Sequence, residues 1–219
     1  MYDYLAMVGE FIGTFLFLWL AFTGDKLSYA NVPDNTTILF IALSFGMALT
    51  VTCWCFFRVT GAAFNPAVTL SLWFIGGITT FRAILVFFAQ MIGGIAAAAI
   101  SKGLTVQRGP IGFSVVNKTA NGVSNGQALG IEMFTTSVLV FSVLMLAAEK
   151  HRSTFLAPVC IGLALFIGHL ASIGWTGAGM NPARSFGPSV VNGDFPSNAW
   201  VYYLGQLLGA FLATLICAS

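Results

Sequence analysis

The chain has 219 residues, of which 58% are hydrophobic and only 7% are charged. Soluble domains carry about 25% charged residues, so this composition excludes an ordinary soluble protein and predicts a chain that crosses a membrane several times. The net charge of +2 comes from nine basic and seven acidic residues. They are scattered singly, so no basic run is available to bind nucleic acid or anionic lipid.

Charged residues delimit six apolar stretches, each of about the 20 residues that a transmembrane helix needs. We expect spans at Tyr4–Gly24, at Thr37–Phe57, between Arg82 and Lys102, at Gln127–Ala148, at Thr154–Trp175 and from Ser197 to the last residue. The first stretch has no basic leader and no clear cleavage site, so we expect a retained span and not a signal peptide.

Two similar segments follow the second and fifth spans. They are Gly61-Ala62-Ala63-Phe64-Asn65-Pro66-Ala67 and Gly177-Ala178-Gly179-Met180-Asn181-Pro182-Ala183. In each, Asn stands where a helix N-cap would, and Pro stands at the first helical position. The apolar residues that follow, Val68–Phe74 and Ser185–Val191, make only about two turns at 1.5 Å per residue. The pattern predicts two half-helices.

The second Asn lies 116 residues after the first, and the same interval separates Gln90 from Gln206. We therefore expect one channel domain over 1–219, built as an internal duplication. Repeat 1 covers about 1–104, a connecting loop about 105–126, and repeat 2 about 127–219. Three spans per repeat invert the second repeat, so the half-helices meet near the membrane midplane. Non-helical backbone at that depth must line a watery cavity, which predicts a pore.

Two Asn-Pro-Ala boxes, the second continuing as Arg184-Ser185, resemble those of the aquaporin (major intrinsic protein) family, and the resemblance extends from Glu10 to Gly209. It implies an all-α membrane protein with six transmembrane helices and two re-entrant half-helices in an inverted 3+3 repeat. It also implies a homotetramer with one pore per subunit and with both termini in the cytoplasm. We expect water as the transported substrate, the lipid bilayer as surroundings, the plasma membrane as location, and no cofactor or metal. The stretch Glu149–Pro158 is similar to fungal water channels.

Glu10 and Glu132 lie inside predicted spans, where a charge costs at least ~3 kcal/mol unless it has a partner. The resemblance implies that these acids hold the re-entrant loops by accepting backbone N–H bonds. A proton-relay or substrate-binding acid of a transporter is the alternative interpretation.

Asn65 and Asn181 are expected to cap the half-helices and to donate from their side-chain NH₂ groups into the pore. A water molecule that accepts both bonds points its hydrogens away, which interrupts a proton wire. The free carbonyls expected along the water file are those of Gly61, Ala62, Ala63, Gly177, Ala178 and Gly179. The two half-helix dipoles together oppose a proton by about 3 kcal/mol. Desolvation and Arg184 are expected to supply the remaining exclusion.

The resemblance implies a narrow filter formed by Phe45, His169, Ala178 and Arg184, and a pore wall that includes Phe17, Leu49, Leu139 and Leu165. His169 and Arg184 are expected to donate hydrogen bonds to water. The glycerol-conducting branch of the family typically has Gly in place of His169 and Asp in place of Ser185, so the filter predicts water selectivity. A facilitator of glycerol, ammonia or hydrogen peroxide and a poorly conducting junction protein remain alternatives. The sequence shows no nucleophile–base pattern, so no catalytic residue is expected.

The cysteines Cys53, Cys55, Cys160 and Cys217 fall in apolar stretches with no zinc-binding spacing. We expect small hydrophobic side chains away from the water file. Ala178 stands where some family members have a mercury-sensitive Cys.

Basic residues divide equally between the two predicted sides of the membrane, so they do not decide the orientation of the chain. The glycosylation sequons at Asn35 and Asn117 fall in loops on the same predicted outer side.

Overall fold

The computed structural model describes residues 2–28, 35–105, 115–149 and 152–218, and all of its regular elements there are helical. The elements are α1 (Tyr2–Ser28), α2 (Asn35–Phe56), α3 (Pro66–Phe74), α4 (Thr80–Leu104), α5 (Asn125–Val143), the π-helical turn η1 (Leu144–Ala148), the 3₁₀ turn η2 (Arg152–Leu156), α6 (Ala157–Thr176), α7 (Pro182–Asn192) and α8 (Trp200–Ala218). Six helices in these ranges are long and apolar enough to cross a membrane. The predicted all-α fold with six spans is confirmed.

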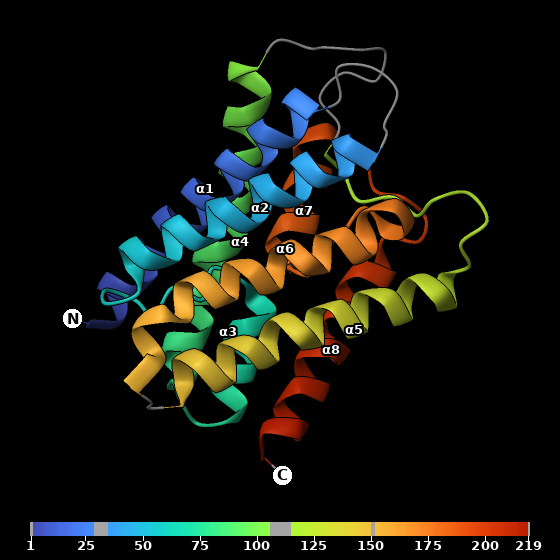
Figure 1. Cartoon of the computed structure of the whole chain (residues 1–219). Helices are drawn as coiled ribbons and strands as arrows, with labels where there is room; N and C mark the ends of the chain where they lie inside the picture. The colour runs from blue at the N-terminus through green and yellow to red at the C-terminus, as the bar shows by residue number, and fades with distance from the viewer. Residues whose placement is uncertain (1, 29–34, 106–114, 150–151, 219) are drawn as a thin grey trace.

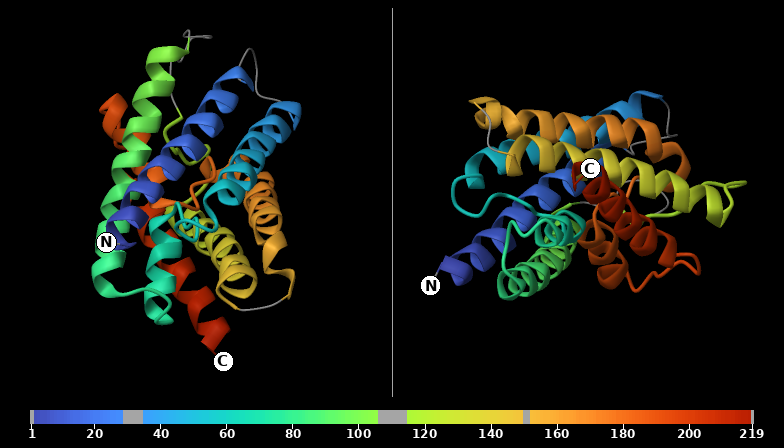
Figure 2. Two further views of the ribbon diagram at one scale, coloured as in Figure 1. Left: turned by 90° about the vertical axis from the view of Figure 1, so that its left-hand side faces the viewer. Right: turned by 90° about the horizontal axis from the view of Figure 1, so that it is seen from below.

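The long helices form a tilted bundle around the two short ones (Figure 1). α1 packs along α4, α5 packs along α8, and α2 packs along α6. α3 packs against α4 and α8, and α7 contacts the same two helices. Each short helix therefore touches long helices from both halves of the chain. Both ends of the chain lie at the same end of the bundle (Figures 1 and 2), as an even number of crossings requires.

Both short helices begin as their sequences predict. The side chain of Asn65 accepts the backbone N–H of Ala67 and thereby caps α3. Asn181 accepts the N–H groups of Ala183 and Arg184 and caps α7. Pro occupies the first position of each helix, where its missing N–H leaves no intrahelical bond unmade.

Small residues allow the long helices to approach closely. A methyl group built on Gly93 of α4 would lie 2.9 Å from the carbonyl oxygen of Phe11 on α1. A methyl group on Gly209 of α8 would lie 2.8 Å from Cβ of Thr136 on α5. Such contact supplies van der Waals attraction within a bilayer, where burial of apolar surface gives no drive for helices to associate. Gly93 and Gly209 thus serve helix packing.

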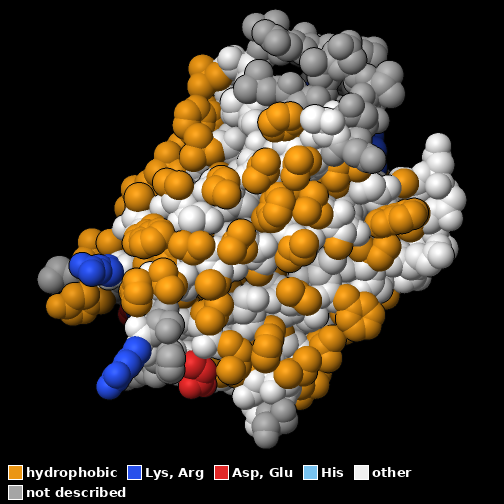
Figure 3. Space-filling view, viewed as in Figure 1, with side chains coloured by type: hydrophobic (Ala, Val, Ile, Leu, Met, Phe, Trp, Pro, Cys, Tyr) orange, Lys and Arg blue, Asp and Glu red, His pale blue; other side chains and the backbone are white. Residues whose placement is uncertain are grey.

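The outer surface is suited to lipid. Hydrophobic side chains are spread over the whole face shown in Figure 3, and the charged side chains lie toward its margins. Phe40, Phe88, Phe134 and Phe211 are each between 49% and 60% exposed. A soluble protein rarely exposes so much contiguous apolar surface, so these rings are expected to contact acyl chains.

Candidate functional site

Glu10 on α1 holds the backbone of the first re-entrant loop. The carboxylate is 1% exposed and accepts four hydrogen bonds: Oε1 from Thr60 Oγ1 (2.6 Å) and the Ala63 N–H (3.1 Å), Oε2 from the Phe64 N–H (2.8 Å) and Gln90 Nε2 (2.9 Å). Four donors offset much of the cost of burying the charge. The same bonds fix the chain immediately before α3.

Glu132 on α5 has the same set of partners in the second loop. Oε1 accepts from Thr176 Oγ1 (2.7 Å) and the Gly179 N–H (2.9 Å), and Oε2 accepts from the Met180 N–H (3.0 Å) and Gln206 Nε2 (3.1 Å). Each of these partners lies 116 residues after its counterpart around Glu10. The two loops are therefore held in the same way by equivalent residues of the two halves.

The loop backbones adopt an unusual conformation at equivalent positions. Ala62, Phe64, Ala178 and Met180 have φ between 48° and 54°. This left-handed region costs a residue other than glycine about 1–2 kcal/mol. Successive backbone N–H groups in a turn can form a concave nest that binds an anion. Here the anions are the two Glu carboxylates, which offset the strain.

This geometry decides where the loop carbonyls point. In a trans peptide the C=O points opposite to the following N–H. Because the Ala63 and Phe64 N–H groups face Glu10, the carbonyls of Ala62 and Ala63 point away from it. The same relation turns the carbonyls of Ala178 and Gly179 away from Glu132. The remaining predicted carbonyl of the first loop, that of Gly61, precedes the Ala62 N–H, which donates to Thr60 Oγ1.

The carbonyl of Gly177 differs from our expectation. It accepts one hydrogen bond from Asn117 Nδ2 (2.8 Å) and one from Arg184 Nη2 (3.3 Å). A carbonyl oxygen has two lone pairs, so both are engaged by side chains. The prediction that Gly177 offers a free carbonyl to water is wrong, because that carbonyl positions Arg184 instead.

Asn65 and Asn181 join the two loops at the centre of the bundle. Asn65 Nδ2 donates to the carbonyl of Met180 (2.8 Å), and Asn181 Nδ2 donates to the carbonyl of Phe64 (2.9 Å). Each NH₂ group therefore uses one hydrogen on the opposite loop and keeps one. The expectation that the whole group donates into the pore is corrected to a single N–H from each Asn.

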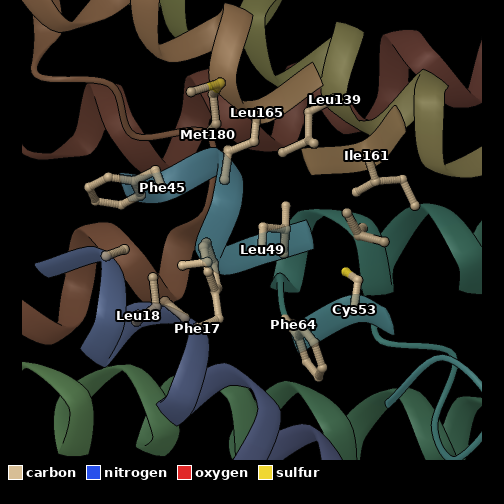
Figure 4. Packing of buried hydrophobic residues seen from close by; sticks show 14 of the residues in the cluster. Phe17, Leu18, Phe45, Leu49, Cys53, Phe64, Leu139, Ile161, Leu165 and Met180 are labelled. Carbon is tan, nitrogen blue, oxygen red and sulfur yellow. The ribbon is translucent and has the colours of Figure 1, made fainter. Parts of the chain in front are cut away.

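A narrow cavity adjoins both Asn side chains. The volume within which the centre of a water molecule can lie is about 10 Å³. Such a volume accommodates roughly one water molecule. Figure 4 shows Phe17, Leu49, Leu139 and Leu165 around this part of the core. The residues lining the cavity are Phe17, Leu49, Ala63, Phe64, Asn65, Val68, Leu139, Val143, Ile161, Leu165 and Asn181.

All four residues predicted for the pore wall thus line one cavity. Sequence reasoning missed four further lining residues, Phe64, Val68, Val143 and Ile161. Val143 follows Leu139 by four residues, and Ile161 precedes Leu165 by four. Helical periodicity places residues four apart on one face, so it could have predicted Val143 and Ile161 as lining residues. Phe64 precedes the capping Asn, and Val68 lies three residues after it.

The residues predicted for the filter come together beyond this cavity. The rings of Phe45 and His169 stack with centroids 4.2 Å apart, and Cζ of Arg184 lies 5.3 Å from the centroid of Phe45. Ala178 follows Gly177, whose carbonyl accepts from Arg184. None of the four filter residues lines the cavity. Rings stacked this closely leave no room for water between them, so any opening must lie beside the pair.

Arg184 is 4% exposed and is held by backbone and by rings. Nη1 donates to the carbonyl of Val115 (2.6 Å), and Nη2 donates to that of Gly177. The guanidinium also lies over the ring of Phe22, with Cζ 5.7 Å from the ring centroid, within range of a cation–π interaction. The sequence did not predict Val115 or Phe22 here. Val115 contacts Arg184 through its backbone carbonyl, so the type of its side chain could not have predicted the contact.

His169 presents an acceptor to its surroundings. Its Nδ1 lies 3.0 Å from the carbonyl of Leu165, and a carbonyl can only accept, so Nδ1 carries the proton. In the neutral ring Nε2 is then an acceptor, and it has no hydrogen-bond partner among the residues described. In this tautomer the proton on Nδ1 is used within α6, so the predicted donation from His169 to water requires a ring that is protonated on both nitrogens.

The cysteines lie apart from the cavity lining. Cys53 is buried, with Sγ donating to the carbonyl of Ala62 (3.6 Å), whereas Cys55 is exposed.

Asn117 of the second sequon is 2% exposed and donates to the carbonyl of Gly177, so the folded protein does not present it for glycosylation. The side chain of Asn35 and the loop residue His151 lie outside the described part of the chain.

The chain resembles known proteins over nearly its whole length. The family model described as "Major intrinsic protein" matches residues 2–217. The chain is 47% identical to Aquaporin-7 and 48% identical to Aquaporin-8 of Botryotinia fuckeliana, with 96% of this chain covered in both cases and 48% and 67% of those relatives. It is 46% identical to Aquaporin-1 of Gibberella zeae over 94% of this chain and 66% of that protein. The chain thus spans about half to two thirds of the length of these relatives.

A solved structure gives independent support for the fold. The aquaglyceroporin from Plasmodium falciparum superposes with a TM-score of 0.80 over 99% of this chain and 94% of the other, at 20% sequence identity. At that identity the likeness shows the fold alone. The family model, the fungal relatives and the shared fold lead to one conclusion: the chain belongs to the major intrinsic protein family.

Proposed function

We propose that this protein is a water channel that carries passive, single-file osmotic flow across a membrane and excludes protons. Family membership and six apolar helices make it an integral multi-pass membrane protein and support a channel for water or small solutes. The observation that carries the finer proposal is the cavity beside Asn65 and Asn181, whose volume has room for about one water molecule. No catalytic step is part of the proposal.

Selectivity for water is proposed to arise at Phe45, His169, Ala178 and Arg184. The stacked rings of Phe45 and His169 occupy space that a three-carbon polyol would need. His169 Nε2 offers an acceptor, and the guanidinium of Arg184 is rich in donors. A single water molecule can bind both groups, because it donates through its hydrogens to Nε2 and accepts through its oxygen from the guanidinium. The similarity to an aquaglyceroporin structure concerns the fold and does not favour glycerol as the substrate.

Proton exclusion is proposed to arise at the two Asn residues. Each has one N–H left after bridging to the opposite loop. A central water that accepts both bonds cannot also accept a proton from its neighbour. The carbonyls of Ala62, Ala63, Ala178 and Gly179 supply acceptors along the file. Because the oxygens of Glu10 and Glu132 are engaged with the loops, we propose a holding role for these acids and no proton relay.

The larger assembly is also proposed from family resemblance. Repeats at about 1–104 and 127–219 are supported by the equivalent networks around Glu10 and Glu132. We propose a homotetramer with one pore in each subunit, located in the plasma membrane. The position of both chain ends at one end of the bundle fits two cytoplasmic termini.

The proposal is tested by osmotic shrinkage of vesicles that contain the purified protein. A pore lowers the activation energy of water flow, because water in the file keeps most of its hydrogen bonds. We expect shrinkage much faster than in empty vesicles, with a weaker temperature dependence. A temperature dependence equal to that of the empty vesicles would contradict flow through a pore, whatever the absolute rate.

A further inference from the structure

Residues 115–120, which we call the strap, lead toward α5 without regular secondary structure of their own. Figure 1 shows the strap passing the end of α6. The Ala120 N–H donates to the carbonyl of Trp175 in the last turn of α6 (2.8 Å). The strap also packs closely on Gly177, because a methyl group built there would lie 3.5 Å from the backbone nitrogen of Lys118. The strap is therefore held against the start of the second re-entrant loop.

The guanidinium of Arg184 binds one carbonyl of the strap and one carbonyl of the loop. Nη1 donates to the carbonyl of Val115 in the strap (2.6 Å), and Nη2 donates to that of Gly177 in the loop (3.3 Å). A guanidinium is a rigid, planar fork of donors. Its orientation therefore depends on the spacing between these two carbonyls.

The side chain of Asn117 joins the same two segments. Its Nδ2 donates to the carbonyl oxygen of Gly177 (2.8 Å), which is the oxygen that also accepts from Arg184. Asn117 lies two residues after Val115, so this bond fixes the strap directly beside the other acceptor of Arg184. The side chain is buried, which protects the bond from competing water.

The Asn117 amide has one orientation that suits its partner. A carbonyl oxygen only accepts, so the NH₂ end of the amide faces Gly177. Oδ1 is then the other end of the amide, and it is buried without a hydrogen-bond partner among the residues that the structure describes. A buried acceptor without a partner carries a free-energy cost. A side chain that served packing alone would avoid this cost, which favours a role for the amide at Gly177.

We propose that Asn117 is a positioning residue for the filter, because it fixes the spacing of the two carbonyls that orient Arg184. This inference rests on the proposed channel function. Without the Asn117 donor, the strap and the loop move apart, and the guanidinium cannot keep both of its bonds. Arg184 then leaves its place beside Phe45, and the opening widens. A solute slightly larger than water passes more readily, while water flow continues.

The first test is the variant Asn117→Leu, which keeps a side chain of similar size and removes the donor. The protein should still fold, because the carbonyl of Gly177 keeps its bond from Arg184 and the strap keeps its bond to Trp175. The measurement is the ratio of formamide to water permeability, both corrected for empty vesicles, and the number of channels cancels from it. Formamide is a planar amide only slightly larger than water. We expect this ratio to rise about fivefold, the factor that corresponds to the net contribution of one hydrogen bond.

A second variant and a matched control complete this test. Asn117→Ala removes the same bond without adding apolar atoms, so it should raise the ratio as well, and it replaces Asn117→Leu if that variant does not fold. The control is Thr119→Val, which removes another bond of the strap, from Asn198 Nδ2 to Thr119 Oγ1 (3.0 Å). It also removes the same glycosylation sequon and should leave the ratio unchanged. An equal rise in the control would overturn the proposal, because any loosening of the strap would then suffice.

A double-mutant cycle connects the effect to Arg184. In an Arg184→Val background, Asn117→Leu should produce no further rise in the ratio, because the group that Asn117 positions is absent. An unchanged ratio in a correctly folded Asn117 variant would overturn the proposal. An equal rise in both backgrounds would overturn it as well, because Asn117 would then act without Arg184.

Chemical modification tests the positioning without any conduction. Arg184 is 4% exposed, so it should react slowly with an arginine-specific dicarbonyl reagent in the parent. In Asn117→Leu it should react several times faster, measured by peptide mass spectrometry against the exposed Arg58, whereas Thr119→Val should match the parent. Equal reactivity in the parent and in Asn117→Leu would contradict the positioning role. If the parent itself does not conduct, the proposed function fails, while this measurement still tests the role of Asn117.

Discussion

Asn65 and Asn181 bind each other's loops through reciprocal hydrogen bonds. Asn65 Nδ2 donates to the carbonyl of Met180, and Asn181 Nδ2 donates to the carbonyl of Phe64. Each Asn also caps its own half-helix through Oδ1. The side chains proposed to orient water are thus the ones that join the two halves of the chain. Their contributions to stability and to conduction have to be measured separately.

Replacement of one of these residues should destabilise the protein even before conduction is considered. Asn181→Ala removes an N-cap worth about 1 kcal/mol and leaves the buried carbonyl of Phe64 without its donor, at a cost of about 1–3 kcal/mol. We expect a clearly lower midpoint of thermal unfolding in detergent. The control is Asn121→Ala, at an exposed turn before α5. A midpoint equal to the parent's would show that the bridge between the loops contributes little.

The carboxylates that hold the loops should tolerate no neutral substitute. In Glu132→Gln, one oxygen is replaced by an NH₂ group that cannot accept, so either the pair Thr176 and Gly179 or the pair Met180 and Gln206 loses its acceptor. Breaking a buried charged network in this way costs about 3–5 kcal/mol, so we expect little folded protein in the membrane. The exposed Glu149 provides the control as Glu149→Gln. Normal yield and unfolding temperature for Glu132→Gln would refute the holding role.

Mercury should have little effect on the unmodified protein. Its described thiols do not line the cavity, and the filter position Ala178 has no sulfur. In the variant Ala178→Cys, mercuric ion should therefore block water flow, and added thiol should reverse the block. Strong block of the parent would contradict this assignment. Repeating the experiment with Cys53→Ala would then show whether the buried thiol near Ala62 is responsible.

Removal of the two stacked rings should widen the filter. The variant with Phe45→Ala and His169→Ala loses the pair whose centroids lie 4.2 Å apart. We expect gained permeability to glycerol and urea, with water permeability kept. Phe88→Ala is the control, because that ring is 59% exposed on the outer surface of α4. A correctly folded double variant that still rejects glycerol would place the selective constriction elsewhere.

Arg184 is expected to add to the exclusion of cations that the two Asn residues and the half-helices provide. The two half-helix dipoles together supply about 3 kcal/mol against a proton, or about two decades in rate. Arg184→Val removes the full positive charge at the filter, so vesicles with this variant should leak protons or small cations. A pH-sensitive dye inside the vesicles provides the measurement. If the variant leaks protons no faster than the parent does, the centre of the pore is sufficient to exclude them without Arg184.

The sequence predicted the parts of the site that depend on local pattern. Asn followed by Pro gave the start of both half-helices, and the family resemblance gave Phe17 and Leu139, which line the cavity. It did not predict contacts made across the fold by backbone atoms. Val115 holds Arg184 through a carbonyl, and no side-chain pattern encodes that role. The proton position on His169 likewise depends on the carbonyl of Leu165.

Other features required the two halves to be brought together. The bridge from Asn65 to Met180 spans 115 residues, so local propensity carries no information about it. The left-handed conformation of Ala62 and Phe64 is uncommon for these residue types and is stabilised by Glu10 on another helix.

The most direct test of the account compares water and glycerol permeability in the same vesicles. The purified protein is reconstituted, and light scattering follows shrinkage in an impermeant osmolyte and then re-swelling in glycerol. We predict water flow far above that of empty vesicles, together with glycerol entry no faster than in those vesicles. Water flow equal to that of empty vesicles would contradict the channel, and glycerol entry well above theirs would contradict the water-selective filter.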